Sequence, residues 1–305
     1  MKILVTGGAG FIGSHVTKLL LDQKNQVTVL DDLSHGYKNA IDQRADFIEA
    51  GLSNQQKLEE ILPGHDAVIH MASFIEVGES VKKPIEFAEN NIVNTVKLLE
   101  AMKNAGVKKI IFSSSACVYG VPEKQPITED VPLGEQENVY GLTKVNMEQF
   151  CMLYHKLYGF DVVILRYFNP YGPGELHTPE THAIPNIIKA ALNKKSIPLY
   201  WKGQQVRDFI YIDDLTLAHT LPLELTGLHI YNVGTETGVK VMEVIKKIFE
   251  IIGYESAIDD LGERKGDVPS LVASSAKIKA ELGWEPKTSL DEGLKKTINF
   301  FQKPL

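Results

Sequence analysis

A tyrosine and a lysine stand four residues apart in the segment Val139–Lys144, which reads VYGLTK. On a helix, residues i and i+4 share one face, so the phenol of Tyr140 and the ammonium group of Lys144 are expected to be neighbours. A phenol ordinarily titrates near pH ~10, and a nearby positive charge lowers that pKa by favouring the phenolate. The pair is either a proton-transfer site or an ordinary contact on a solvated helix face.

A run of serines provides a third candidate group. The segment FSSSACVYG covers Phe112–Gly120 and follows an apolar, β-branched run that is typical of a strand. Its hydroxyl groups are therefore expected at the carboxyl edge of a sheet, where α/β proteins bind their ligands. A serine hydroxyl beside a phenol and an ammonium group could hold a substrate oxygen while the phenol accepts its proton.

A glycine-rich turn lies at the N-terminus. The segment VTGGAGFIG follows a strand pattern and opens a helix pattern, which is the context that makes a dinucleotide fingerprint credible. Glycines permit the tight turn and let backbone N–H groups approach a diphosphate. The expected binding residues of this turn are Gly7, Gly10, Phe11, Ile12 and Gly13.

Two acidic residues end the second strand pattern. Asp31 follows Gly13 at the spacing of the carboxylate that binds the adenosine ribose, with Asp32 as its competitor. A carboxylate there would repel a 2′-phosphate, so the sequence favours NAD over NADP.

The elements that must position these groups follow a regular order. Short β-branched runs alternate with helical patterns up to about Tyr167, which predicts an α/β fold with a Rossmann-type doubly wound parallel sheet. The segment after Arg166 is rich in Pro and Gly and reads as a loop. The part from Gly234 onward predicts a smaller mixed α/β lobe.

Composition excludes several classes of function. The net charge of −7 disfavours a general nucleic-acid or membrane-surface role, and no apolar run approaches membrane-spanning length. Two cysteines cannot form a disulfide framework or a four-ligand zinc site. We therefore expect a cytoplasmic protein with no metal, no nucleic-acid partner and no membrane association.

The ordered motifs resemble a known family. A Gly-x-x-Gly-x-x-Gly turn, a serine and Tyr-x-x-x-Lys are the pattern of the short-chain dehydrogenase/reductase superfamily, and the segments RYFNPYG and RDFIYIDD resemble its extended, nucleotide-sugar branch. Within that branch the chain is most similar to the UDP-glucose 4-epimerase family, notably in VGESV and in Ser115-Ala116. The resemblance implies NAD as cofactor, a UDP-sugar as substrate and a homodimer.

The resemblance also implies roles for individual residues. The catalytic group would be Ser115, Tyr140 and Lys144. Cofactor contacts would include Ala72, Asn90 and Tyr167, together with Tyr140 and Lys144. The substrate contacts would be Ser115, Asn169, Asn186, Tyr200, Arg207, Arg264 and Asp267.

The family implies a division into domains. Residues 1–168, with 207–233 returning to them, would bind NAD, and residues 169–206 and 234–305 would form the UDP-sugar lobe. The dimer would form through helices near 86–104 and 141–158.

Some positions depart from the family pattern. Gly51 replaces an aspartate that contacts adenine, and Ile75 replaces a lysine beside the cofactor phosphates, so cofactor retention is expected to be looser. Leu271 leaves space at C2 of the sugar, so an N-acetylhexosamine is an alternative to a hexose.

Other functions in the same branch remain open. Ala116 and Cys117 lack the general acid of the dehydratases and decarboxylases. The alternatives are a UDP-glucuronate 4-epimerase, a decarboxylase, a reductase or a non-catalytic NAD-binding regulator.

Overall fold

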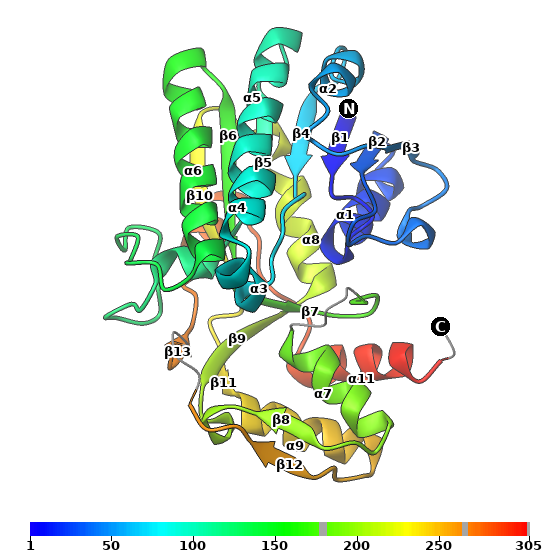
Figure 1. The fold of residues 1–305 in the computed structure, drawn as a ribbon, viewed down its shortest axis with the longest axis vertical. Helices are drawn as coiled ribbons and strands as arrows, with labels where there is room; N and C mark the ends of the chain where they lie inside the picture. The colour runs from blue at the N-terminus through cyan, green and yellow to red at the C-terminus, as the bar shows by residue number, and fades with distance from the viewer. Residues whose placement is uncertain (177–181, 264–267, 304–305) are drawn as a thin grey trace. The chain divides into compact units, whose positions relative to one another are not determined.

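The computed structural model describes residues 1–176, 182–263 and 268–303 of the 305-residue chain (Figure 1). The chain divides into two compact units. The first contains Met1–Gly120, Pro132–Tyr167 and Thr216–Tyr231, and the second contains Val121–Val131, Phe168–Leu215 and Asn232–Leu305.

The first unit is built on a seven-stranded sheet with the order β10-β6-β5-β4-β1-β2-β3. All the pairings from β3 through β1 to β6 are parallel, which confirms the predicted Rossmann-type topology. The strands are β1 (Lys2–Thr6), β2 (Gln26–Asp31), β3 (Asp46–Glu49), β4 (Ala67–His70), β5 (Lys109–Ser115), β6 (Asp161–Tyr167) and β10 (Leu228–Val233).

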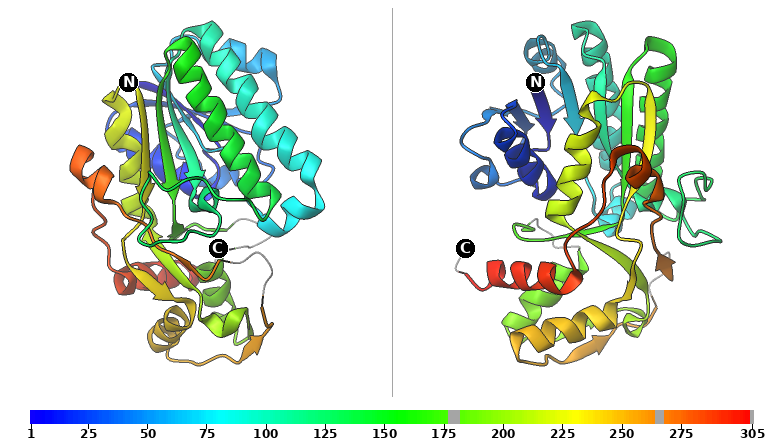
Figure 2. Two further views of the ribbon diagram at one scale, coloured as in Figure 1. Left: turned by 90° about the vertical axis from the view of Figure 1, so that its left-hand side faces the viewer. Right: turned by 180° about the vertical axis from the view of Figure 1, so that it is seen from behind.

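Helices cover both faces of this sheet, with α5 and α6 on one side and α1 on the other (Figures 1 and 2). Side chains on both faces of the strands are therefore buried under helices, which explains why the strands are almost continuously apolar. One cluster joins Leu4 and Ile110 of the sheet to Leu98 and Met147 of the helices, all fully buried. The helices are α1 (Phe11–Asp22), α2 (Gln55–Ile61), α5 (Asn94–Ala105) and α6 (Val139–Tyr158).

The helix expected over 86–104 is not one regular helix. After the short helices α3 (Val77–Lys82) and α4 (Pro84–Phe87), the chain forms a π-helical segment, η2 (Ala88–Val93), before α5 begins. Such segments often occur at functional sites because they turn side chains away from the regular helical spacing.

The second unit is the smaller mixed α/β part. Strand β9 (Val206–Tyr211) lies at its centre and pairs with β7 (Asn169–Tyr171), β11 (Gly238–Lys240) and β13 (Ser270–Leu271). A separate pair joins β8 (Ile197–Leu199) to β12 (Ile258–Asp260). The helices are α7 (Ala183–Leu192), α9 (Val241–Ile252), α10 (Ala276–Leu282) and α11 (Leu290–Phe301); α8 (Ile212–Thr220) crosses the boundary between the units.

The boundaries of the units differ from those expected from the sequence. Residues 207–215, which we expected to return to the first domain, cluster with the second unit because β9 pairs with strands of that unit. Residues 121–131 also belong there, since Ile127 N–H bonds the carbonyl of Val272 at 2.8 Å. The assignment of NAD to one unit and the UDP-sugar to the other stays a prediction. Among the described residues, no helix has both the length and the apolarity needed to cross a bilayer.

Candidate active site

The glycine turn joins β1 to α1 by a backbone path that side chains would block. Gly7 has a φ of +74°, and a Cβ on Gly13 would lie 2.1 Å from the carbonyl oxygen of Gly7. Within the described chain, α1 begins at Phe11 with no side-chain cap and no acidic residue in its first turn. Its first N–H groups are thus available to an anion, as the sequence predicted for a diphosphate.

The carboxylate of Asp31 is hydrogen-bonded to the backbone of this turn. One carboxylate oxygen accepts the N–H of Ala9 at 3.0 Å and the other accepts the N–H of Leu33 at 2.9 Å. Burial raises the pKa of this carboxyl, and the two N–H bonds offset part of the rise. Each oxygen retains a lone pair, so a ribose diol can still bind there.

Asp32 occupies the space that a longer residue at position 51 would need. A Cβ on Gly51 would lie 3.1 Å from Asp32 Oδ2. Asp32 thus places a carboxylate beside position 51, where the family aspartate is missing.

A hollow of about 120 Å³ connects these elements. It collects six of the predicted cofactor residues, Gly7, Gly10, Asp31, Asp32, Ala72 and Asn90. Phe11, Ile12 and Gly13 lie beside it in the first turn of α1, outside its described lining. Its lining also includes residues that the sequence did not single out, namely Ser34, His35, Gly36, Ser73 and Phe74.

The start of α6 is held by two side-chain caps. Asn138 accepts the N–H of Gly141 at 2.8 Å as the N-cap, and Ser80 Oγ accepts the N–H of Tyr140 at 3.1 Å. Ser80 belongs to the VGESV segment, whose role was not evident from its sequence. These caps place Tyr140 in the first turn, one turn before Lys144.

Ser115, Cys117 and Tyr140 form one cluster. Ser115 ends β5 and accepts the N–H of Cys117 at 3.3 Å, and its hydroxyl is hydrogen-bonded to the phenol of Tyr140. Tyr140 as a whole residue is half-buried. The structure therefore brings the predicted serine and tyrosine together.

Lys144 connects this cluster to the hollow. Its side chain is 2% exposed, and Nζ donates to Ser73 Oγ at 2.9 Å and to the carbonyl of Ser113 at 2.8 Å. Ser73 lines the hollow that contains Gly7 and Asp31. Burial lowers the pKa of Lys144 to about 8.

Lys144 does not by itself make the Tyr140 phenol acidic. Burial raises the pKa of the Tyr140 phenol, Cys117 adds to the rise, and only the hydrogen bond with Ser115 is a local opposing effect. Lys144 Nζ lies 5.9 Å from the centre of the Tyr140 ring, and its hydrogen bonds go to Ser73 and Ser113. A further positive charge is needed before the phenol becomes a base near neutral pH.

The expected role of Asn90 is divided between two neighbouring residues. Asn90 lines the hollow, whereas Asn91 is fully buried at the π-helical segment. The side chain of Asn91 bonds both backbone groups of Phe74 and donates to Thr143 Oγ1 at 2.9 Å. Thr143 in turn donates to the carbonyl of Tyr140. The two asparagines are adjacent in the sequence, so the sequence did not distinguish them, and only the structure shows that Asn91 is the buried one.

Tyr167 lies beside Ser115 and is not among the described residues that line the hollow. It is the strand partner of Ser115 in the β5–β6 register and is 4% exposed. Its phenol is hydrogen-bonded to His219 of α8 and to Ser113. Burial raises the pKa of Tyr167, so this phenol is a neutral hydrogen-bonding group.

Apart from Ser115, which ends β5 in the first unit, the predicted substrate residues that the structure describes belong to the second unit. Asn169 lies in β7, Asn186 in α7, Tyr200 before a short 3-10 turn, and Arg207 in β9. Arg264 and Asp267 lie outside the described residues. Next to Arg207, the buried carboxylate of Asp208 accepts the N–H groups of Thr235, Glu236 and Ala273.

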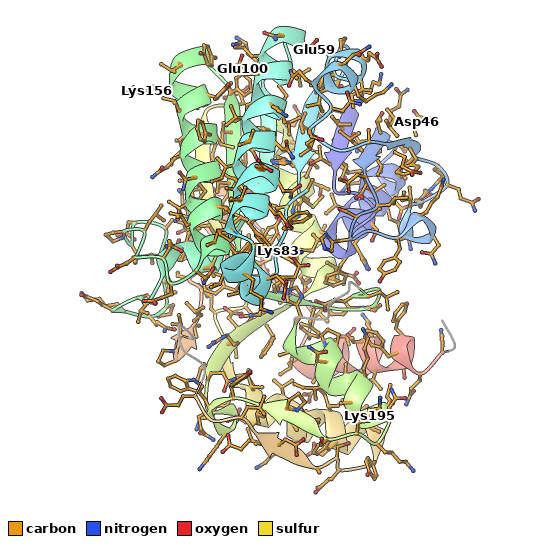
Figure 3. The ribbon with its side chains drawn as sticks, in the orientation of Figure 1. Asp46, Glu59, Lys83, Glu100, Lys156 and Lys195 are labelled. Atoms are coloured by element: carbon orange, nitrogen blue, oxygen red, sulfur yellow. The ribbon has the colours of Figure 1, made fainter. Side chains whose placement is uncertain are left out.

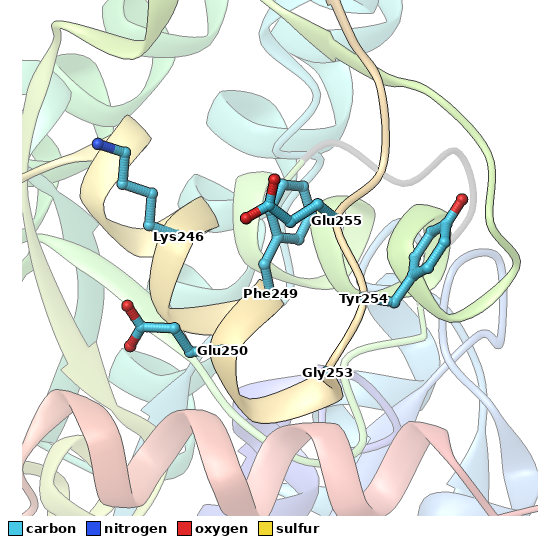
Figure 4. A pocket seen from close by; sticks show the side chains of 6 residues that line it. All are labelled: Lys246, Phe249, Glu250, Gly253, Tyr254 and Glu255. Carbon is cyan, nitrogen blue, oxygen red and sulfur yellow. The ribbon is translucent and has the colours of Figure 1, made fainter.

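Figure 4 shows another hollow, of about 360 Å³, at the end of α9. Its side chains come from α9 and the loop after it and include none of the predicted site residues. Its charged side chains are of both signs, namely Lys246, Glu250 and Glu255. We assign it no role in the candidate active site.

Comparison with known proteins gives a consistent result. The model of the NAD dependent epimerase/dehydratase family matches residues 3–234. The UDP-glucose 4-epimerase of Lactobacillus helveticus is 40% identical over 306 residues, covering 94% of this chain and 92% of the relative.

Solved structures agree with this match over almost the whole chain. The UDP-glucose 4-epimerase of Thermotoga maritima, crystallised with UDP-glucose, has a TM-score of 0.95 at 36% identity and covers 99% of both chains. The UDP-glucose 4-epimerase of Thermus thermophilus, in complex with NAD, has a TM-score of 0.93 at 33% identity and covers 100% of both.

Proposed function

Because the chain belongs to the NAD dependent epimerase/dehydratase family, we propose that it catalyses the NAD-dependent epimerisation of a UDP-hexose at C4. The substrate pair is UDP-glucose and UDP-galactose, with the N-acetylated pair as the second candidate, and the reaction passes through a transient 4-keto sugar. The observation that carries the proposal is Lys144, which bonds Ser73 of the hollow and stands one turn from Tyr140.

The residues present fit NAD. The backbone at Gly13 leaves no space for a side chain, so the turn is shaped for close approach of a diphosphate. Asp31 would bind the adenosine ribose with its remaining lone pairs. When bound, NAD supplies the acceptor and donor of the hydride and a positive nicotinamide charge.

The chain's own residues handle the proton. Tyr140 as phenolate would take the proton of the sugar 4-hydroxyl while bound NAD would accept the hydride of C4. The sugar thus loses two hydrogens as it becomes a ketone, and both are returned in the reverse step. Ser115 donates a hydrogen bond to the sugar oxygen and to the phenolate in turn. Lys144 holds the phenolate electrostatically, and on return of the hydride to the opposite face Tyr140 gives the proton back.

Residues of the second unit are proposed to hold the UDP group while the sugar rotates. Arg207 and Arg264 suit the diphosphate because guanidinium groups bind phosphate oxygens in a bidentate way. Asn169 and Asn186 would bind the sugar and diphosphate, Tyr200 would stack on uracil, and Asp267 would bind the ribose.

The neighbouring reactions of the family are less well supported by the site. Ala116 and Cys117 follow Ser115, where an elimination would need an acid. Burial raises the pKa of the Cys117 thiol to about 11, so it is a poor proton donor near neutral pH.

A homodimer and a cytoplasmic location complete the proposal. Exposed apolar side chains gather on the helices of one side of the first unit. Ile85 is 73% exposed, Leu142 50%, Leu153 43% and Leu157 57%. On α6 the positions 142, 153 and 157 share one face by helical spacing. An apolar stripe of this kind is typical of an interface.

The test is NMR of the purified protein with UDP-galactose, UDP-N-acetylgalactosamine and UDP-glucuronate in separate samples without added NAD. A 4-epimer in any sample supports the proposal, and the relative rates identify the sugar. Product that appears only after NAD is added would indicate weak cofactor retention. A net redox product, or no turnover even with NAD, would overturn the epimerase assignment.

A further inference from the structure

Acidic side chains lie at the proposed NAD hollow. Asp31 and Asp32 both line it. Glu76 is 4% exposed and follows the lining residue Phe74 by two positions, just before α3. Position 75, between them, is an isoleucine. Among the lining residues that the structure describes, His35 is the one side chain that can carry a positive charge.

His35 is placed between these carboxylates by the loop after β2. Its Nε2 lies 3.8 Å from Glu76 Oε1, and its ring meets the edge of the Phe74 ring at a centroid distance of 4.9 Å. Glu76 is itself held by the N–H of Ile75 at 3.1 Å. A positive charge on His35 would also act on Asp31, whose pKa is raised mainly by burial and lowered in part by His35.

We propose that His35 binds the anionic part of NAD as an imidazolium, so that NAD binding takes up a proton. This inference rests on the proposed NAD site. The diphosphate adds negative charge beside Asp31, Asp32 and Glu76, and imidazole is the side chain that changes its charge near neutral pH. The bound diphosphate therefore favours the protonated form of His35. His35 would supply the positive charge that is missing because position 75 is an isoleucine in place of a lysine.

The consequence is a pH-dependent affinity. Protonation accompanies binding, so NAD binds most tightly at acid pH and more weakly as the pH rises. Full uptake of one proton raises the Kd about tenfold for each pH unit. Glu76 contributes because its carboxylate stabilises the imidazolium, so Glu76→Gln should move the same pH dependence to lower pH.

The experiment is isothermal titration calorimetry of NAD into NAD-depleted protein between pH 6.0 and 8.5. Each pH uses two buffers of different ionisation enthalpy, so that protons taken up are counted directly. Three proteins are compared: the wild type, His35→Gln, and the control His229→Gln on β10, which lies outside the hollow in the described structure. The side chain of His35 is 38% exposed, so its replacement should leave the fold intact.

The expected result is proton uptake near neutrality for the wild type and the control. His35→Gln should bind NAD more weakly at pH 6.0, with no uptake and a flat Kd. Uptake that persists in His35→Gln, or a wild-type Kd that does not change with pH, would overturn this inference while leaving the NAD site in place. If none of the proteins binds NAD in any buffer, the proposed cofactor itself is wrong.

Discussion

Burial raises the pKa of the Tyr140 phenol, so the chain's own residues leave this phenol protonated near neutral pH. In the proposed mechanism, its action as a base depends on a positive charge that arrives with the cofactor. Its position depends on Ser80 and Asn138, which cap α6. The ability of Tyr140 to accept a proton near neutral pH thus requires the assembled site and is not a property of the residue alone.

Replacement of Tyr140 by phenylalanine should separate binding from chemistry. Tyr140→Phe removes the proton acceptor and keeps the ring, so turnover of the UDP-sugar should fall by about 10²–10⁴-fold. NAD binding and thermal stability should remain close to wild type. The matched control is Tyr158→Phe on the same helix, a residue that is 40% exposed. Equal turnover in the two variants would remove Tyr140 from the catalytic group.

Lys144 should lower the stability of the protein at neutral pH. Its pKa is about 8 in the folded chain and about 10.5 when unfolded, so the buried charge opposes folding by on the order of 3 kcal/mol below pH 8. Its two hydrogen bonds return about 1 kcal/mol each. Lys144→Met should therefore be inactive yet about 1 kcal/mol more stable at pH 7.

The pH dependence gives the sign of this effect. Between pH 8 and 10.5 the unfolded chain binds the proton that folded Lys144 has lost, so the stability of the wild type rises with pH. Lys144→Met lacks this gain and should become the less stable protein near pH 10.5, as chemical denaturation would measure. The control is Lys156→Met, an exposed lysine near the end of α6 that projects away from the helix (Figure 3). A variant less stable than wild type at pH 7 would show that the two hydrogen bonds dominate.

At the scale of elements, a buried ion pair joins α6 to the sheet. Arg166 of β6 donates to both carboxylate oxygens of Glu148, at 3.0 and 2.7 Å, and to the hydroxyl of Tyr119 at 2.8 Å. Ser114 of β5 donates to the same carboxylate. Glu148 stands one turn after Lys144, so this network holds α6 against the strand that ends in Ser115.

Removing one partner of this pair should destabilise the first unit strongly. Arg166→Met leaves the Glu148 carboxylate buried without its cation, which costs about 3–5 kcal/mol of unfolding free energy. The double variant Glu148→Leu, Arg166→Met should recover most of that loss because no buried charge remains. Urea denaturation measures both. The control is Lys279→Met, which breaks the exposed pair with Glu285 and should change little. A double variant as unstable as the single one would mean that geometry, and not the unpaired charge, dominates.

At the scale of the whole molecule, the exposed apolar stripe on α6 predicts self-association. Leu153→Glu places a charge in the centre of this face, where a partner helix would exclude water. The variant should sediment as a monomer and the wild type as a dimer. The control is Leu228→Glu, a similarly exposed leucine on β10. A wild type that sediments as a monomer would refute the homodimer, and the apolar stripe would then need another explanation.

The sequence by itself determined the local chemistry of this protein. The glycines of the first turn, the alternating strands and helices, and the order of Ser115, Tyr140 and Lys144 all depend on short-range backbone geometry, which a few neighbouring residues specify. The parallel sheet follows for the same reason, because continuous apolar strands can be buried only between two layers of helices.

Only the tertiary structure decided what depends on distant neighbours. Burial sets the protonation of Tyr140 and Lys144, and no local pattern reports burial. The π-helical segment chose between Asn90 and Asn91, and the fold brought His35 to Glu76 and Lys144 to Ser73 across long stretches of chain. The assignment of residues 207–215 to the second unit was likewise set by strand pairing, which joins segments that the sequence keeps apart.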